Sequence, residues 1–180
     1  LYTLFKKIEA VEIDELSGLI GYLHRIGIND PWSAYIDADD CNSKRHILRL
    51  RQAGLTLPDR DYYLEDTTKM RSIRAKYRKF VEKSWQLVPE LASSRDKLWR
   101  SVWEFEISIA RISRTSTQLR DVEKNYNKTT YSKLKADYPA IDWKDYSKAV
   151  RWSPDDKVTV DQPEFFKFIN KKMLDMPLEQ

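Results

Sequence analysis

Few residues in this sequence have types and spacings that could support chemistry, and those few lie far apart. Histidine occurs only as His24 and His46, and no two histidines lie one helical turn apart, as a zinc-binding helix would require. Cys41 is the single cysteine, which excludes an internal disulfide and a cysteine-rich zinc site. The 4 glycines form neither a phosphate-binding loop nor the G-x-S-x-G turn of a serine nucleophile. The residues by themselves therefore predict no catalytic or metal-binding group.

Acidic side chains offer two further candidates. Asp37, Asp39 and Asp40 form a cluster, but they lack the ligand spacing and the glycine of a calcium-binding loop, which favours a solvated turn. Glu106 falls on the apolar side of a predicted helix. A carboxylate there is either a general acid or base with a raised pKa, or a structural partner of an arginine. Because no second carboxylate or histidine follows at helical spacing, we favour the structural role.

The stretch GLTLPDRDYYL, residues 54–64, combines the charge density of a site with the residues of a turn. Pro58 fixes φ and ends a strand, and Asp59 can cap the short helical turn that follows. Arg60 and Asp61 are then placed for ion pairing, and the two tyrosines after them offer a large buried area with hydroxyl groups. The segment is therefore predicted to turn the chain from a sheet into helices, which is a structural role.

The elements that must position these residues are mainly helical. Only 4 glycines in 180 residues argue against an all-β fold, which needs many tight turns. We predict a mainly α fold, a multi-helix bundle with one small β-hairpin (about 32–52) and a short extra strand (about 157–160). The first predicted helix covers 13–26, with Asp14 as the cap at its start and Gly27 at its end. Two longer helices follow, one at 73–88 that ends at Pro89 and one at 98–112 that is capped by Ser93 or Ser94. Three more are predicted from Thr129 or Thr130 to Pro139, after Asp142, and from Pro163 onward.

The composition is that of a folded protein, with 33% charged and 41% hydrophobic residues. A length of 180 residues predicts one domain, and no apolar run is long enough for a membrane span, so no membrane contact is expected. The net charge is +4, with both signs interspersed. The most basic stretch, residues 71–83, is best explained as a solvated helix face, so nucleic-acid binding is not expected.

One long segment and three shorter ones resemble a known family. ILRLRQAGLTLPDRDYYL is similar to the signature of the neprilysin-like zinc metallopeptidases, which include neprilysin, endothelin-converting enzyme and bacterial oligopeptidases. VWEFEISIA, VEKNYNKTTYSKLKADYPAIDWKDY and VTVDQPEFFKFINKKML resemble three further family segments, in the family's order. The signature positions are Gln52, Gly54, Leu55, Leu57, Pro58, Arg60, Asp61, Tyr62, Tyr63, Glu106, Tyr126, Asn127 and Trp143.

The resemblance implies a role without catalysis by these residues. Family members hold zinc with H-E-x-x-H and a downstream glutamate in a C-terminal domain, whereas all the segments above belong to the mainly helical N-terminal domain that covers the active-site cavity. Residues 1–180 are therefore expected to be a single, incomplete part of that domain, without the catalytic domain. Zinc and the peptide substrates would be bound in the missing part of the enzyme.

Two details follow from the resemblance. The family segment at 54–64 carries an arginine, Arg60, and the family segment VWEFEISIA carries Glu106. Glu106 is therefore expected to be buried and paired with an arginine, with Arg60 as the first candidate, or with a tyrosine hydroxyl. Since the secreted mammalian members are rich in disulfides, the lone Cys41 points to a bacterial relative. The compartment stays open between the bacterial cytoplasm and the cell envelope or a secreted location.

Two other classes of function are alternatives to the peptidase hypothesis. The chain could be a stand-alone helical protein-interaction module that has lost the peptidase domain, or a basic nucleic-acid binder whose affinity falls steeply with salt. A helical domain cut from its enzyme should also expose an apolar patch and self-associate. The final helix is the expected carrier of that patch, through Phe165, Phe166, Phe168 and Ile169.

Overall fold

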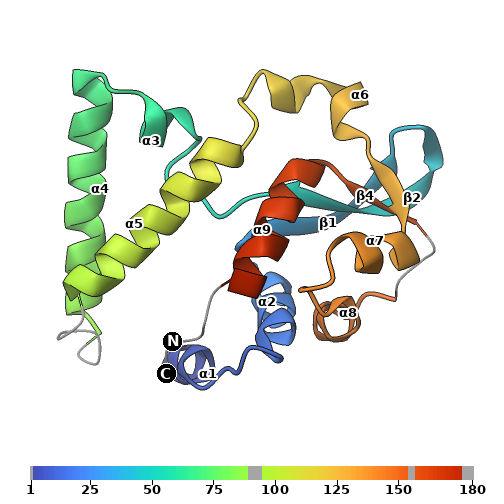
Figure 1. The fold of residues 1–180 in the computed structure, drawn as a ribbon, viewed down its shortest axis with the longest axis horizontal. Helices are drawn as coiled ribbons and strands as arrows, with labels where there is room; N and C mark the ends of the chain where they lie inside the picture. The colour runs from blue at the N-terminus through green and yellow to red at the C-terminus, as the bar shows by residue number, and fades with distance from the viewer. Residues whose placement is uncertain (1, 89–94, 154–156, 176–180) are drawn as a thin grey trace. The chain divides into compact units, whose positions relative to one another are not determined.

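The computed structural model describes residues 2–88, 95–153 and 157–175 (Figure 1). The chain divides into two compact units: residues 1–53 with 120–180 form unit 1, and residues 54–119 form unit 2. The fold is mainly α with a small sheet, which confirms the predicted class. The expected stop at Pro89 and the expected caps at Ser93 and Ser94 lie outside the described residues.

Unit 1 contains a sheet with helices around it. In the described part of the chain the sheet has four strands in the order β1-β2-β4-β3, and the β1–β2 pair is the predicted hairpin. β4 pairs parallel with β2 and antiparallel with β3, so the predicted extra strand joins the hairpin to a strand that the sequence did not indicate. The elements are α1 (Tyr2–Glu9), α2 (Leu16–Arg25), β1 (Trp32–Asp39), β2 (Asn42–Gln52), α6 (Val122–Asn125), β3 (Lys128–Thr130), α7 (Tyr131–Asp137), α8 (Trp143–Val150), β4 (Lys157–Val160) and α9 (Pro163–Asp175).

The core of unit 1 is built around Trp32, at the start of β1. Its side chain is fully buried, and rings from three helices surround it. The centroid distances are 5.6 Å to His24 of α2, 5.5 Å to Tyr146 of α8 and 5.9 Å to Phe166 of α9. One aromatic side chain on an edge strand thus holds three helices against the sheet.

His24 is the polar member of this core. Its Nδ1 lies 2.8 Å from the Tyr146 hydroxyl and its Nε2 lies 3.2 Å from the Asp30 carbonyl oxygen, so both ring nitrogens have partners in the neutral imidazole. Burial lowers the pKa of His24, although hydrogen bonds to the backbone oppose this effect. His24 therefore acts as a neutral structural group in this core.

The caps of the helices show which sequence signals were reliable. Gly27, at φ +88°, ends α2 in a Schellman arrangement: its N–H donates to His24, and the next N–H, that of Ile28, donates to Leu23. Thr130 and Asp142 cap α7 and α8 through their side chains, as predicted. The predicted cap at Asp14 is wrong, because α2 begins after Glu15 without any side-chain cap.

The final helix corrects another expectation. Phe165 and Phe166 are 0% exposed and Ile169 is 1% exposed, so α9 does not carry the predicted exposed apolar patch. Phe166 packs on Tyr138 and Trp32 within the unit, and Phe165 meets Phe166 edge-on. Among the described residues, none of the helices is both long and apolar enough to cross a membrane.

Unit 2 consists of α3 (Asp61–Leu64), α4 (Thr68–Gln86) and α5 (Arg95–Ile112), and the short 3-10 turn η2 (Gln118–Arg120) follows at its boundary. Thr67 caps α4 by accepting a hydrogen bond from the Met70 N–H at 3.2 Å. Figure 1 shows α4 and α5 approaching each other at one end and diverging toward the end where α3 lies. Trp99 and Trp103 stack along α5 with centroids 5.5 Å apart and an interplanar angle of 17°.

The contact between α2 and α8 in unit 1 depends on glycine. A Cβ atom added at Gly21 of α2 would lie 2.8 Å from the Tyr146 carbonyl oxygen and 2.8 Å from the Ala149 Cβ, both in α8. A Cβ added at Gly18 would meet only the Asp145 carboxylate, the mobile end of a side chain. The backbones of α2 and α8 therefore approach so closely at Gly21 that no side chain fits.

We expect Gly21→Ala to lower the free energy of unfolding by about 2 kcal/mol, because the methyl group overpacks against backbone that cannot move away. Gly18→Ala is the matched control on the same helix, where the Asp145 side chain can rotate and alanine favours the helix by roughly 1 kcal/mol. Chemical denaturation of both variants measures the difference. Equal stabilities would contradict the close approach at Gly21.

Candidate functional site

The signature segment begins where β2 ends. Gly54 has a positive φ of 81°, which a residue with a side chain rarely adopts, so the sharp turn out of the strand needs glycine. The Asp59 carboxylate then accepts a hydrogen bond from the N–H of Asp61, the first residue of the short helix α3, at 2.9 Å, while Arg60, in the N-cap position, makes no side-chain cap. Leu57 donates its N–H to the Tyr63 hydroxyl at 2.9 Å, which folds the segment back on itself.

A buried carboxylate lies at the centre of unit 2. Glu106 of α5 is 5% exposed, and both of its oxygens accept hydrogen bonds. Thr56 donates through its N–H at 3.2 Å and through its hydroxyl at 2.6 Å. The hydroxyl of Tyr63, from α3, lies 3.2 Å from Oε2, and the hydroxyl of Tyr77, from α4, lies 3.0 Å from each oxygen. The carboxylate thus joins the signature loop, α3, α4 and α5.

This arrangement confirms one part of the Glu106 prediction and corrects another. The burial and the tyrosine partners are confirmed. The choice of Arg60 is wrong: no ion pair joins Arg60 to Glu106, and neither Arg60 nor Asp61 makes a salt bridge in the part of the chain that the structure describes. The Arg60 Nε is buried there without a hydrogen-bond partner. Neutral hydroxyl and amide donors suffice to solvate the carboxylate, so it needs no cation.

Aromatic rings pack against the two buried tyrosines of this hydrogen-bond cluster. Tyr63 lies 5.5 Å from Trp103, and Tyr77 meets Trp99 edge-on at 5.6 Å. Burial raises the pKa of Tyr63 well above its usual range, and the neighbouring Glu106 carboxylate adds to the effect, while the hydrogen bond from Leu57 opposes it. Tyr63 therefore stays protonated and acts as a hydrogen-bond donor to Glu106.

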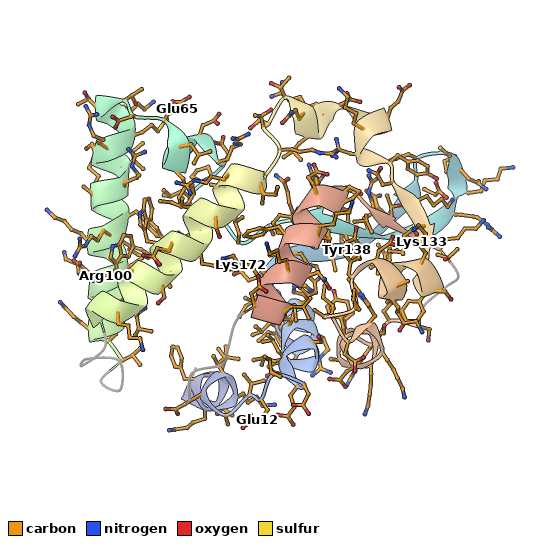
Figure 2. The ribbon with its side chains drawn as sticks, viewed as in Figure 1. Glu12, Glu65, Arg100, Lys133, Tyr138 and Lys172 are labelled. Atoms are coloured by element: carbon orange, nitrogen blue, oxygen red, sulfur yellow. The ribbon has the colours of Figure 1, made fainter. Side chains whose placement is uncertain are left out.

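Arg74 of α4 closes the other end of α3. Its guanidinium donates to the carbonyl oxygens of Tyr62, Tyr63 and Glu65 at 3.0, 3.4 and 2.8 Å. These carbonyls belong to the last turn of a helix, which has no further N–H groups to satisfy them. Figure 2 labels Glu65 just after α3. No sequence pattern indicated this contact, because a basic residue on a basic helix resembles any solvated one.

The remaining signature residues lie in unit 1, around the end of β4. The Gln52 N–H donates to the Gln162 side chain at 2.9 Å, and the Gln162 amide donates to Asn125 at 2.6 Å. Asn127 accepts a hydrogen bond from the Val160 N–H at 3.1 Å through its carbonyl oxygen, which continues the strand pairing. Trp143 is 1% exposed and packs in the core of unit 1.

Tyr126 connects this region to the hairpin. Its hydroxyl donates to Asp39 at 2.6 Å, and Lys128 forms an ion pair with the same carboxylate. The hydrogen bonds from Lys128 and Tyr126 lower the pKa of Asp39 to about 2. Asp39 is therefore a structural anion, whereas the sequence suggested only a solvated acidic turn.

Arg49 forms the second charged group that sequence reasoning missed. Its guanidinium donates to Asp40 at 2.7 Å and to Asp161 at 3.3 Å, which ties the hairpin turn to the end of β4. Burial raises the pKa of Asp161 although the charge and hydrogen bonds of Arg49 oppose it. The parallel pairing of β4 with β2 brings Asp161 beside Arg49, and no local pattern in the sequence indicates this pairing.

The described residues contain no arrangement that would hold a metal. Among them, no three side chains of the His, Cys, Asp and Glu types lie close enough together to bind one ion. The predicted site residues fall into two groups, one around Glu106 in unit 2 and one around β4 in unit 1. Glu106 and Tyr63 in the first group and Tyr126 in the second hold segments of the fold together through their side chains.

Residues 1–180 match the model of peptidase family M13 along the whole chain. The chain belongs to peptidase family M13. This confirms the resemblance to the neprilysin-like metallopeptidases, and the region matched is the N-terminal one.

Curated relatives are much longer than this M13 chain. An endothelin-converting enzyme homolog of Locusta migratoria is 33% identical over 141 residues, which are 75% of this chain and 19% of that protein. Endothelin-converting enzyme-like 1 of Mus musculus is 33% identical over 115 residues, which are 63% of this chain and 15% of that protein. The chain thus spans less than a fifth of either relative.

Solved structures share the fold of this M13 chain. The zinc metalloprotease Zmp1 of Mycobacterium tuberculosis, in complex with an inhibitor, matches with a TM-score of 0.88 and 22% identity over 99% of this chain and 27% of that chain. PepO from Lactobacillus rhamnosis matches with a TM-score of 0.73 and 15% identity over 94% of this chain and 27% of that chain.

We expect Glu106→Ala to lower the free energy of unfolding by about 3 kcal/mol, because the buried hydroxyls of Tyr63 and Tyr77 lose their acceptor. Glu106→Gln, which keeps one oxygen and the side-chain shape, should cost about half as much. Glu104→Ala is the matched control, since Glu104 is exposed on the same helix. Chemical denaturation checks the series, and a change below about 0.5 kcal/mol for Glu106→Ala would show that the carboxylate is solvated.

Proposed function

We propose that this chain is part of the helical N-terminal domain of a zinc-dependent metalloendopeptidase, and that this domain covers the active-site cavity and admits only short, flexible peptides. The observation that carries the proposal is the match of residues 1–180 to peptidase family M13. The fold shared with a zinc metalloprotease over 99% of this chain supports it.

The proposal assigns zinc to the part of the protein outside these 180 residues. The described residues do not fit a zinc site, because none of their His, Cys, Asp and Glu side chains form a group of three. In a metallopeptidase, bound zinc activates water and polarises the peptide carbonyl. Peptide substrates would accordingly be held by the catalytic part of the enzyme, and this chain would limit their access.

The geometry around Glu106 suits that role. A wall that excludes substrates by size must keep its shape when a peptide presses against it. The Glu106 carboxylate ties three helices and the signature loop together, and the stacked Trp99 and Trp103 fill the space beside it. Satisfied buried hydrogen bonds and close packing make such a wall rigid.

We expect the 180-residue chain alone to bind no stoichiometric zinc and to hydrolyse no peptide, and the full-length protein to do both. Metal analysis after chelation and zinc reloading, together with a fluorogenic peptide assay, measures this. A one-to-one zinc complex of the 180-residue chain that cleaves peptide would contradict the proposal. A full-length protein without zinc or activity would favour the alternative, a helical protein-interaction module.

A further inference from the structure

One face of α4 combines positive charge with exposed apolar side chains. The residues at 69, 76, 80, 83 and 87 follow one another at spacings of seven, four, three and four, which places them on one side of the helix, with residue 79 beside them. Phe80 is 65% exposed and Leu87 is 84% exposed. We call this surface the lysine face; it consists of Lys69, Lys76, Lys79, Lys83, Phe80 and Leu87.

The lysine face has no partner of its own in the described part of the chain. None of its four lysines makes a salt bridge there, and the neighbouring Glu82 is engaged by Arg78 at 2.7 Å on another side of the helix. Exposed aromatic and aliphatic side chains among unpaired cations indicate a surface that binds something both acidic and apolar.

The same sequence carries a surface with the opposite charge. Residues 12–15, which we call the acidic turn, connect α1 to α2 and consist of Glu12, Ile13, Asp14 and Glu15. All four are exposed, and Ile13 is 50% exposed. Figure 2 labels Glu12 on this connection. No salt bridge engages these three carboxylates in the described residues, whereas the nearby Glu9 is paired with Lys6 at 2.9 Å.

We propose that the lysine face binds the acidic turn of a second copy of this chain. Ile13 of one copy packs on Phe80 of the other, and Glu12 and Glu15 lie beside Lys79 and Lys83. The stretch of α4 from Lys79 to Leu87 is about 12 Å long, which a four-residue turn can cover. Each copy carries one lysine face, on α4, and one acidic turn, between α1 and α2.

The acidic turn is favoured as the partner because it combines negative charge with an exposed apolar side chain, Ile13, which are the two properties that the lysine face requires. Exposed charge pairs alone contribute little to binding, so the association depends on the apolar pair, and the charges select the partner. A nucleic acid would match the lysines but not Leu87. The inference is independent of the proposed peptidase function, since it concerns only the surfaces of this chain.

Charge reversal tests the proposal sharply. We compare the wild-type chain with K79E/K83E and E12K/E15K by sedimentation equilibrium over a wide concentration series. The wild type should dimerise, and about 0.5 M salt should weaken the dimer only modestly, because salt screens the exposed charges and leaves the apolar pair in place. Each variant alone should associate at least about tenfold more weakly. An equimolar mixture of the two variants should recover the dimer, because each face then meets a turn of opposite charge.

K167E/K171E is the matched control, since it reverses two exposed lysines at the same spacing on α9. It should dimerise like the wild type. A wild-type chain that stays monomeric at every concentration would overturn the proposal. So would a mixture of the two variants that fails to associate although both are folded by circular dichroism. Binding of the wild type to DNA or anionic vesicles with no self-association would also overturn it, by assigning the lysine face to another partner.

Discussion

A buried carboxylate must be solvated by the protein, and in unit 2 this requirement is met at Glu106. Water is replaced by the Thr56 amide and hydroxyl and by the hydroxyls of Tyr63 and Tyr77. The three donor residues come from three different segments, so the carboxylate is satisfied only when the signature loop, α3, α4 and α5 are all in place. The segment GLTLPDRDYYL therefore serves the architecture of the domain, because its uncharged Thr56 and Tyr63 complete this network.

In unit 1, contacts from several distant segments meet around β4, as those in unit 2 meet around Glu106. The strand pairs with both β2 and β3, and the residues at its end bind the hairpin turn through Arg49 and the segment before β3 through Gln162. The Trp32 side chain contacts rings of α2, α8 and α9 and so packs these helices against the sheet. Signature residues that are far apart in sequence are neighbours of these contacts, which explains why the family pattern is scattered along the chain.

The parts that the sequence predicted are those with local causes. The hairpin, the strand at 157–160, the caps at Thr130 and Asp142 and the glycine stop at Gly27 each follow from neighbouring residues. Strand β3, the Arg49–Asp161 pair and the burial of Phe165 and Phe166 depend on pairing between distant segments, which no local pattern encodes. For Glu106 the burial was predictable from its apolar neighbours. The identity of its donors was not, because arginine, tyrosine and backbone amides are all chemically suitable partners.

Amide hydrogen exchange at Thr56 and Leu57 tests the central claim most directly. Both residues lie outside helices and strands, and their N–H groups donate only to side chains, those of Glu106 and Tyr63. If the carboxylate network organises unit 2, both amides should exchange as slowly as the amides in the middle of α5, on the order of 100-fold or more below the rate of an unstructured chain. Exchange of Thr56 and Leu57 at the unstructured rate, with α5 still protected, would contradict the account.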